Sequence, residues 1–104
     1  MKFNIKGKFA ILEKGILMFS CPACKQAHQI QVGKGDGPRW GWNGDYNSPT
    51  FTPSLRVKWY EGPEHKLCMC HSFITDGRIQ FLGDSTHVLA KQTVDLPEWQ
   101  GVFG

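Results

Sequence analysis

The sequence predicts a mainly β fold of the α+β class, built from a small antiparallel sheet and one short helix. Asp76-Gly77 stands between two β-prone runs, and Asp-Gly is a strong hairpin signal because a type I′ turn needs positive φ at both central residues. Cys21-Pro22-Ala23-Cys24 joins two further strand-like runs. Glycine (12) and proline (6) are abundant among the 104 residues, which is typical of a turn-rich β domain.

The predicted elements follow one another along a single domain, residues 1–104, whose core spans about residues 8–97. Gly7 separates the arms of a first hairpin, and Pro97 ends the last strand, because proline cannot donate to a sheet. Residues 98–104 form a tail. The expected strands are Phe3–Ile5, Lys8–Leu12, Ile16–Ser20, Ala27–Val32, Leu55–Tyr60, Met69–Thr75, Arg78–Leu82 and Thr93–Leu96.

The Asp76-Gly77 turn sets the register of the hairpin around it. Ile74 should face Ile79 and Ser72 should face Phe81, because directly opposed residues share a face of the sheet. One face is then core, with Cys70, Ser72, Ile74, Ile79 and Phe81. The other face carries His71 and is predicted to be the wall of a site.

A short helix over residues 85–90 should follow this hairpin. Asp84 is a good N-cap, because its carboxylate can accept the free N–H groups of a first helical turn. His87 would then lie in that turn, close to His71 at the end of the hairpin.

The Cys21-x-x-Cys24 turn between two strands has the form of a zinc knuckle, which directs two sulfurs at one ion. The other ligands come from the central hairpin, where Cys68 and Cys70 lie on one face and His71 on the other. The sequence favours a Zn site of Cys21, Cys24, His71 and His87, with His28 and Cys70 in supporting positions around it. A closed site of Cys21, Cys24, Cys68 and Cys70 is the alternative.

The segment from Trp40 to Ser54 interleaves large aromatic side chains with asparagine, glycine and proline. It can be a loop that covers the core, or a wall that binds a polar ligand or an extended peptide next to the metal. Trp42, Asn43 and Ser54 are the candidate binding residues of this wall.

Composition and charge argue against several classes of partner. The net charge is +3, and the lysines are spread along the chain, whereas a nucleic-acid interface needs a clustered basic patch. No apolar run approaches the length of a membrane span, and Glu13 and Lys14 interrupt the only candidate signal peptide. We therefore expect a cytoplasmic protein with reduced thiols and a protein or peptide partner.

Several motifs together resemble a known family. They are Cys21-Pro22-Ala23-Cys24 with His28, Trp42-Asn43-Gly44, Pro49 to Ser54, Cys70-His71-Ser72-Phe73, Asp76-Gly77, Asp84 to Ala90 and Thr93 to Pro97. This pattern resembles a family of small phage and prophage zinc-binding proteins, often labelled "ammonia monooxygenase". Relatives occur in bacterial operons that encode ubiquitin-like proteins, where the resemblance implies a peptidase. Ser85 stands where the family usually has cysteine, and Lys91 where it usually has glycine.

Two functions follow from these observations. The first is a zinc-dependent hydrolase, such as a peptidase acting on a protein or ubiquitin-like tail, in which Asp84 or Glu13 serves as general base. The alternative is a non-enzymatic module in which structural zinc folds the domain and the aromatic wall binds a protein. Phage morphogenesis and nucleic-acid binding are weaker alternatives.

Overall fold

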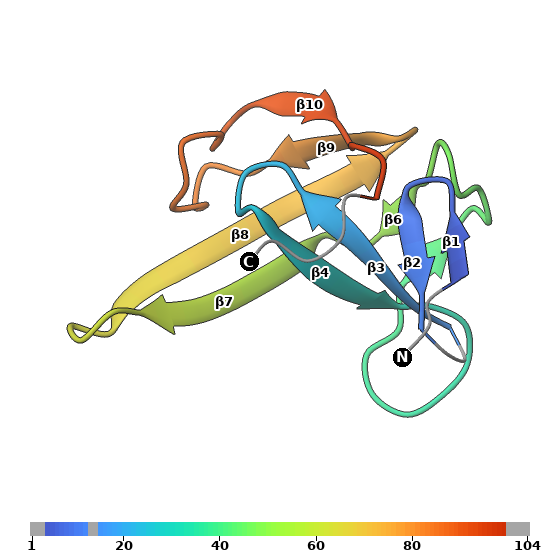
Figure 1. Ribbon diagram of the computed structural model, residues 1–104, viewed down its shortest axis with the longest axis horizontal. Helices are drawn as coiled ribbons and strands as arrows, with labels where there is room; N and C mark the ends of the chain where they lie inside the picture. The colour runs from blue at the N-terminus through green and yellow to red at the C-terminus, as the bar shows by residue number, and fades with distance from the viewer. Residues whose placement is uncertain (1–3, 13–14, 100–104) are drawn as a thin grey trace.

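Two four-stranded antiparallel sheets and a small two-stranded sheet make up the computed structural model, which describes residues 4–12 and 15–99. The first sheet has the order β1-β2-β3-β4 and the second the order β10-β9-β8-β7 (Figure 1). The strands are β1 (Asn4–Lys6), β2 (Phe9–Ile11), β3 (Ile16–Cys21), β4 (Gln26–Gln31), β5 (Gly41–Trp42), β6 (Phe51–Thr52), β7 (Leu55–Glu61), β8 (Lys66–Thr75), β9 (Arg78–Phe81) and β10 (Thr93–Asp95). The prediction of a mainly β fold is confirmed.

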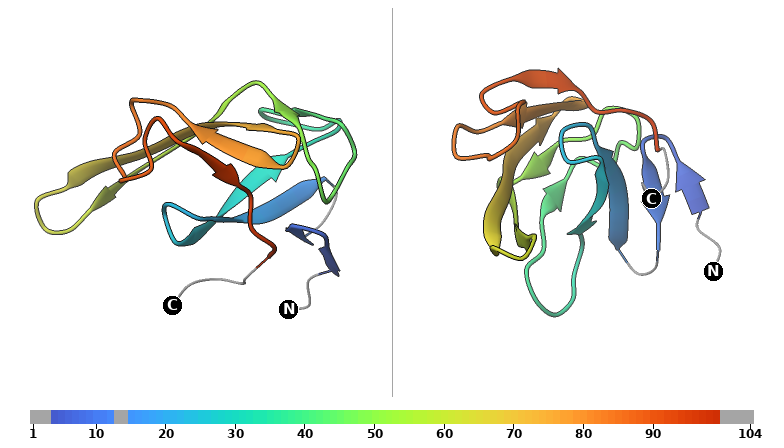
Figure 2. Two further views of the ribbon diagram at one scale, coloured as in Figure 1. Left: turned by 90° about the horizontal axis from the view of Figure 1, so that it is seen from above. Right: turned by 60° about the vertical axis from the view of Figure 1, so that its left-hand side comes forward.

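The core lies between the two large sheets. Figure 2 shows these sheets one above the other. Alternate residues of each sheet face inward and form one apolar cluster. From the first sheet it contains Phe9, Leu17, Phe19, Cys21 and Ile30, and from the second Leu55, Cys70, Ile74, Ile79 and Phe81.

The β8–β9 hairpin has the predicted register. Ile74 pairs with Ile79, Ser72 pairs with Phe81, and Asp76 has the positive φ that the turn requires. Cys70, Ser72, Ile74, Ile79 and Phe81 are all buried, so the predicted core face is confirmed. The opposite face of β8 carries Leu67, Met69, His71 and Phe73, and it faces outward.

The predicted helix over residues 85–90 is wrong, because residues 82–92 form turns and irregular chain. The carboxylate of Asp84, the expected N-cap, contacts the His71 ring and not the backbone N–H groups of a helix. The hydroxyls of Ser85 and Thr86 bond to the backbone of β8, which holds the segment against the strand. These contacts with a strand distant in the sequence replace the helix, because tertiary context can override local propensity.

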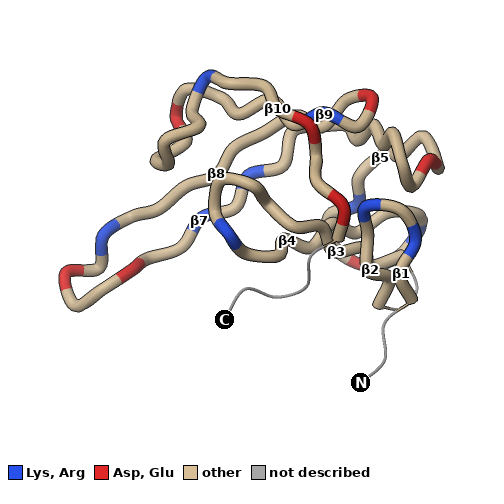
Figure 3. The backbone as a smooth tube through the Cα atoms, turned by 45° about the horizontal axis from the view of Figure 1, so that its top comes forward, with Lys and Arg blue, Asp and Glu red and all other residues tan. Residues whose placement is uncertain are grey.

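Charged residues are scattered over the fold, as Figure 3 shows, with acidic residues at several turns and basic ones along β7. In residues 4–12 and 15–99, no helix has the length and hydrophobicity needed to cross a bilayer.

Candidate active site and metal centre

A chain of hydrogen bonds links three side chains on the outer face of the second sheet. The Nε2 atom of His71 lies 2.9 Å from the Ser54 hydroxyl oxygen. On the other side of the ring, Nδ1 lies 3.0 Å from Oδ2 and 3.1 Å from Oδ1 of Asp84. Ser54 and His71 are half-buried, and Asp84 is exposed.

Sheet pairing brings Ser54 and His71 together although 17 positions separate them. Ser54 comes directly before β7, where Arg56 is paired with His71 on β8. Ser54 therefore lies diagonally across from His71, on the same face, within the reach of diagonal neighbours in a sheet. The indole Nε1 of Trp40 donates to the Ser54 carbonyl over 3.2 Å and holds the backbone at this position.

Asp84 and the backbone of His71 are held by the segment that follows β9. The Ser85 hydroxyl accepts from the His71 N–H and donates to the His71 carbonyl, each over 3.1 Å. Thr86 makes the same pair of contacts with Met69, two residues earlier, at 2.9 Å and 3.3 Å. The two hydroxyls thus hold the segment after β9 against the backbone of β8. This places Asp84 beside the His71 ring.

These contacts fix the proton arrangement of the site. An ionised Asp84 carboxylate only accepts hydrogen bonds, so Nδ1 of His71 carries the hydrogen. The Nε2 atom is then free to accept the proton of the Ser54 hydroxyl. A serine, an imidazole and a carboxylate in this order form a nucleophile, a general base and the group that orients the base.

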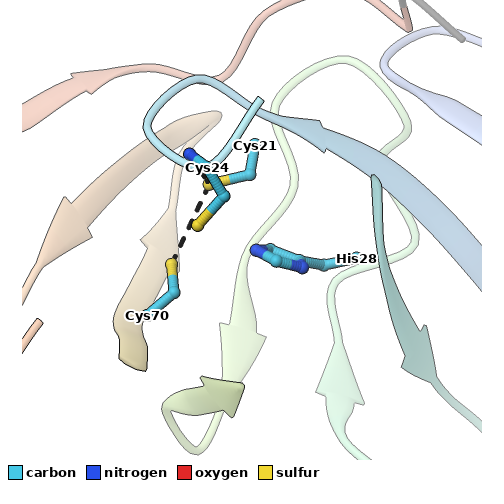
Figure 4. A group of neighbouring side chains, drawn as sticks. All are labelled: Cys21, Cys24, His28 and Cys70. Atoms are coloured by element: carbon cyan, nitrogen blue, oxygen red, sulfur yellow. Dashed lines mark hydrogen bonds between the residues drawn. The ribbon is translucent and has the colours of Figure 1, made fainter. Parts of the chain in front are cut away.

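A second group of side chains lies between the two sheets. The ligand atoms of Cys21, Cys24, His28 and Cys70 all lie within 4.8 Å of one another, an arrangement that can hold a metal ion. Figure 4 shows the three sulfurs and the His28 ring turned toward a common centre. Cys70 comes from β8 and reaches Cys21 across the core, with 3.9 Å between the sulfurs.

The knuckle itself forms where β3 ends and β4 begins. Its backbone turns at Lys25, which has a φ of 57°. The N–H of Cys24 donates to the Cys21 sulfur over 3.4 Å, the kind of contact that supports a metal thiolate. Cys21 pairs with Gln26 and Phe19 pairs with His28, so the register of this hairpin places His28 beside the sulfurs.

The thiols influence one another strongly. Hydrogen bonds from the side chains of Cys24 and Cys70 lower the pKa of Cys21 well below its usual range. The same contacts with Cys21 raise the pKa of Cys24 to about 12 and raise that of Cys70 further. One thiolate is therefore stabilised by two thiols, and further ionisation is opposed by charge and burial. A divalent cation at the centre would reverse this, because it favours the thiolate form of every ligand.

The donor set fits zinc in a structural role. Three sulfurs and one imidazole nitrogen are a standard closed set for Zn²⁺. His28 is 5% exposed, and its Nε2 atom has no hydrogen-bond partner within the described residues. A buried imidazole nitrogen without a partner is costly, and a metal bond would satisfy it.

Three of the four predicted metal ligands are divided between the two sites, and His87 belongs to neither. The structure gathers Cys21 and Cys24 with His28 and Cys70, the two residues expected in supporting positions. His71 contacts Ser54 and Asp84 through its two ring nitrogens. His87 lies outside the metal-binding group, with its ring edge-on to Phe81, and burial lowers its pKa.

The remaining predicted residues have local contacts. Cys68, a ligand in the alternative set, borders a pocket beside Cys24 and is not part of the group. The Asn43 side chain bonds backbone groups of its own loop, and Trp42 stacks on Phe51. That Trp42 and Asn43 bind substrate stays a prediction. Glu13, a candidate base, lies outside the described residues, as does the end of the predicted tail.

Sequence reasoning singled out Ser54, His71 and Asp84 but gave them three unrelated roles. One signal connects them. Leu55, Val57 and Trp59 are the apolar positions of an alternating strand, so Ser54 belongs to the outward set of that strand. His71 belongs to the outward set of its own strand, and the missing information was that these two strands are neighbours.

Comparison with known proteins identifies the family. Searches of curated proteins and of solved structures find no match. A family model described as "Bacterial ubiquitination-like system serine protease (BubE)" matches residues 2–82, which include Ser54, His71 and all four residues of the metal-binding group. Asp84 follows two residues after the matched region. The match covers well over half of the chain, and the protein therefore belongs to the BubE family of bacterial ubiquitination-like system serine proteases.

Proposed function

We propose that this protein is a serine protease that cleaves a protein substrate in a bacterial ubiquitination-like system. The observation that carries the proposal is the unbroken line of contacts from the Ser54 hydroxyl through His71 to Asp84. The family description supports both the reaction class and the kind of system.

The reaction would proceed in two stages. The Ser54 oxygen attacks the scissile carbonyl while its proton passes to Nε2 of His71, and a tetrahedral oxyanion forms. His71 then gives this proton to the leaving group, the scissile bond breaks, and an ester of Ser54 remains. Water, deprotonated by the same Nε2 atom, attacks the ester, and Nε2 then returns the proton to the Ser54 oxygen as the acid is released. Asp84 stays ionised and stabilises the imidazolium formed in each stage.

We further propose that Cys21, Cys24, His28 and Cys70 hold a structural zinc ion. When bound, the ion would supply a cross-link between the two sheets. The mechanism expected from the sequence, a zinc-activated water, needs an open coordination position. Four protein donors leave none, so the nucleophile in this proposal is Ser54.

A covalent probe for activated serines tests the catalytic proposal. A fluorophosphonate should form a stable ester with the Ser54 oxygen and release fluoride, which intact-protein mass spectrometry detects as one adduct. Ser54→Ala should abolish the adduct and reduce cleavage of a ubiquitin-like protein substrate to background. His71→Ala should reduce labelling by about 10²-fold or more, the scale of general-base catalysis.

The matched control is Ser48→Ala, which removes the hydroxyl of an exposed serine in a nearby loop. It should label and cleave as the unchanged protein does. Persistent labelling or cleavage in Ser54→Ala would refute the assignment of the nucleophile.

A further inference from the structure

A face of the second sheet lies beside the triad of Ser54, His71 and Asp84 and carries a defined set of side chains. Outward-facing residues of β7 and β8 are paired across the strands, Arg56 with His71, Lys58 with Met69 and Tyr60 with Leu67. We call this set the β7–β8 outer face. Ser54 lies at one end of it, and the β7 side chains Arg56, Lys58 and Tyr60 are exposed.

Two cations on this face have no carboxylate partner in the structure. Within residues 4–12 and 15–99, the ion pairs are His71 with Asp84 and Arg78 with Asp95. Arg56 and Lys58 belong to neither. Figure 3 shows basic positions following β7, while the acidic residues of this arm lie near its tip. Two positive charges without a carboxylate partner therefore lie along β7, next to the nucleophile.

We propose that the β7–β8 outer face binds an extended, acidic segment of the protein substrate, with Arg56 and Lys58 contacting its carboxylates. This inference rests on the proposed function, because it places the segment on one side of the bond that Ser54 attacks. Charge complementarity of this kind sets specificity and steers encounter between partners.

The spacing of the cations predicts where the acidic residues should be. Antiparallel strands rise about 3.4 Å per residue, so Arg56 lies roughly 7 Å and Lys58 roughly 14 Å along the strand from Ser54. An extended peptide has the same rise and presents alternate side chains to one face. Acidic residues two and four positions from the scissile bond would therefore lie over Arg56 and Lys58.

The experiment varies charge on both partners. The substrate is a ubiquitin-like protein with a C-terminal extension, in which the residues two and four positions to each side of the scissile bond are Glu, Gln or Lys. On one side of the scissile bond, the unchanged enzyme should cleave the Glu substrate with a kcat/KM about tenfold higher than that of the Lys substrate. This preference should become smaller at high salt. The Arg56→Glu, Lys58→Glu double variant should reverse this preference.

Arg78→Glu is the control, since it makes one such charge reversal on the same sheet, two strands away from β7. It should leave the preference unchanged. Fluorophosphonate labelling of Ser54 needs no substrate and should be equal in the unchanged enzyme and in Arg78→Glu. If Ser54 is labelled but the enzyme does not discriminate Glu from Lys, the inference fails alone. If Ser54 is not labelled, the proposed function fails.

Discussion

Single hydroxyl groups decide the geometry of the triad. Ser85 is 8% exposed, and its hydroxyl makes two hydrogen bonds to the backbone of His71. Asp84, the neighbouring residue, holds the His71 ring. Ser85 therefore positions both His71, the proposed base, and Asp84, the group proposed to orient it, although Ser85 touches no proposed reacting atom.

We expect Ser85→Ala to lower kcat by about tenfold or more with little change in KM, because small misplacements of catalytic groups are costly. The His71 N–H left without its partner should also cost about 1–3 kcal/mol of stability, while the His71 carbonyl keeps its bond from the Leu82 N–H. Ser85→Thr keeps the hydroxyl and should restore most of kcat. Thr86→Ala is the matched control, since it removes equivalent contacts to Met69. An equal loss of kcat in both alanine variants would contradict the positioning role.

The same residues show how far sequence reasoning reaches at this scale. Alternation on β8 correctly separated Cys70 from His71, one facing the core and the other facing out. The choice between them as metal ligand depended on which face the knuckle packs against, and that is a property of tertiary packing. Its position on the core face favours a supporting position for Cys70 and makes His71 the predicted ligand. The structure shows that the knuckle packs against this face.

Among the elements, the β8–β9 hairpin was predictable and the segment after it was not. The hairpin is specified locally, by a turn that requires positive φ and by strands with opposite faces. Residues 84–90 carry a good local helix signal. The side chains of Ser85 and Thr86, however, bond to β8, a strand that is distant in the sequence. Long-range hydrogen bonds of this kind can override the local helix propensity.

The turn of this hairpin offers a test through Gly77, which has a φ of 77°. An added Cβ would lie 3.1 Å from the Ser48 Cα and 3.2 Å from the Asn47 carbonyl oxygen. Gly77→Ala should therefore cost the strain of a left-handed residue, about 1–2 kcal/mol, and the displacement of a packed loop in addition. Gly44→Ala is the matched control, with a φ of 82° and open space around it.

Chemical denaturation should show a larger loss of unfolding free energy for Gly77→Ala than for Gly44→Ala. Equal losses would mean that the contact between the hairpin turn and residues 47 and 48 does not contribute to stability.

At the scale of the whole molecule, the metal-binding group connects the two sheets and lies next to the triad. Cys21, Cys24 and His28 come from the first sheet or its turn, and Cys70 comes from the second. Cys70 and His71 are adjacent on β8 and face opposite sides. A metal bond to Cys70 would therefore fix the segment of strand that presents His71, so that one site supports the other.

Metal removal is the test at this scale. Structural zinc binding contributes about 10–16 kcal/mol in small domains, comparable to the total stability of about 5–15 kcal/mol of a typical domain. We therefore expect one zinc per chain by elemental analysis, and a large drop in Tm with loss of Ser54 labelling after chelation. Cys70→Ser should lose the metal, whereas Cys68→Ser, which changes the neighbouring cysteine outside the group, should keep it. Two results would refute the cross-link: an unchanged Tm after chelation, or stoichiometric zinc in Cys70→Ser. A cross-link must lose its effect when the ion or one ligand is removed.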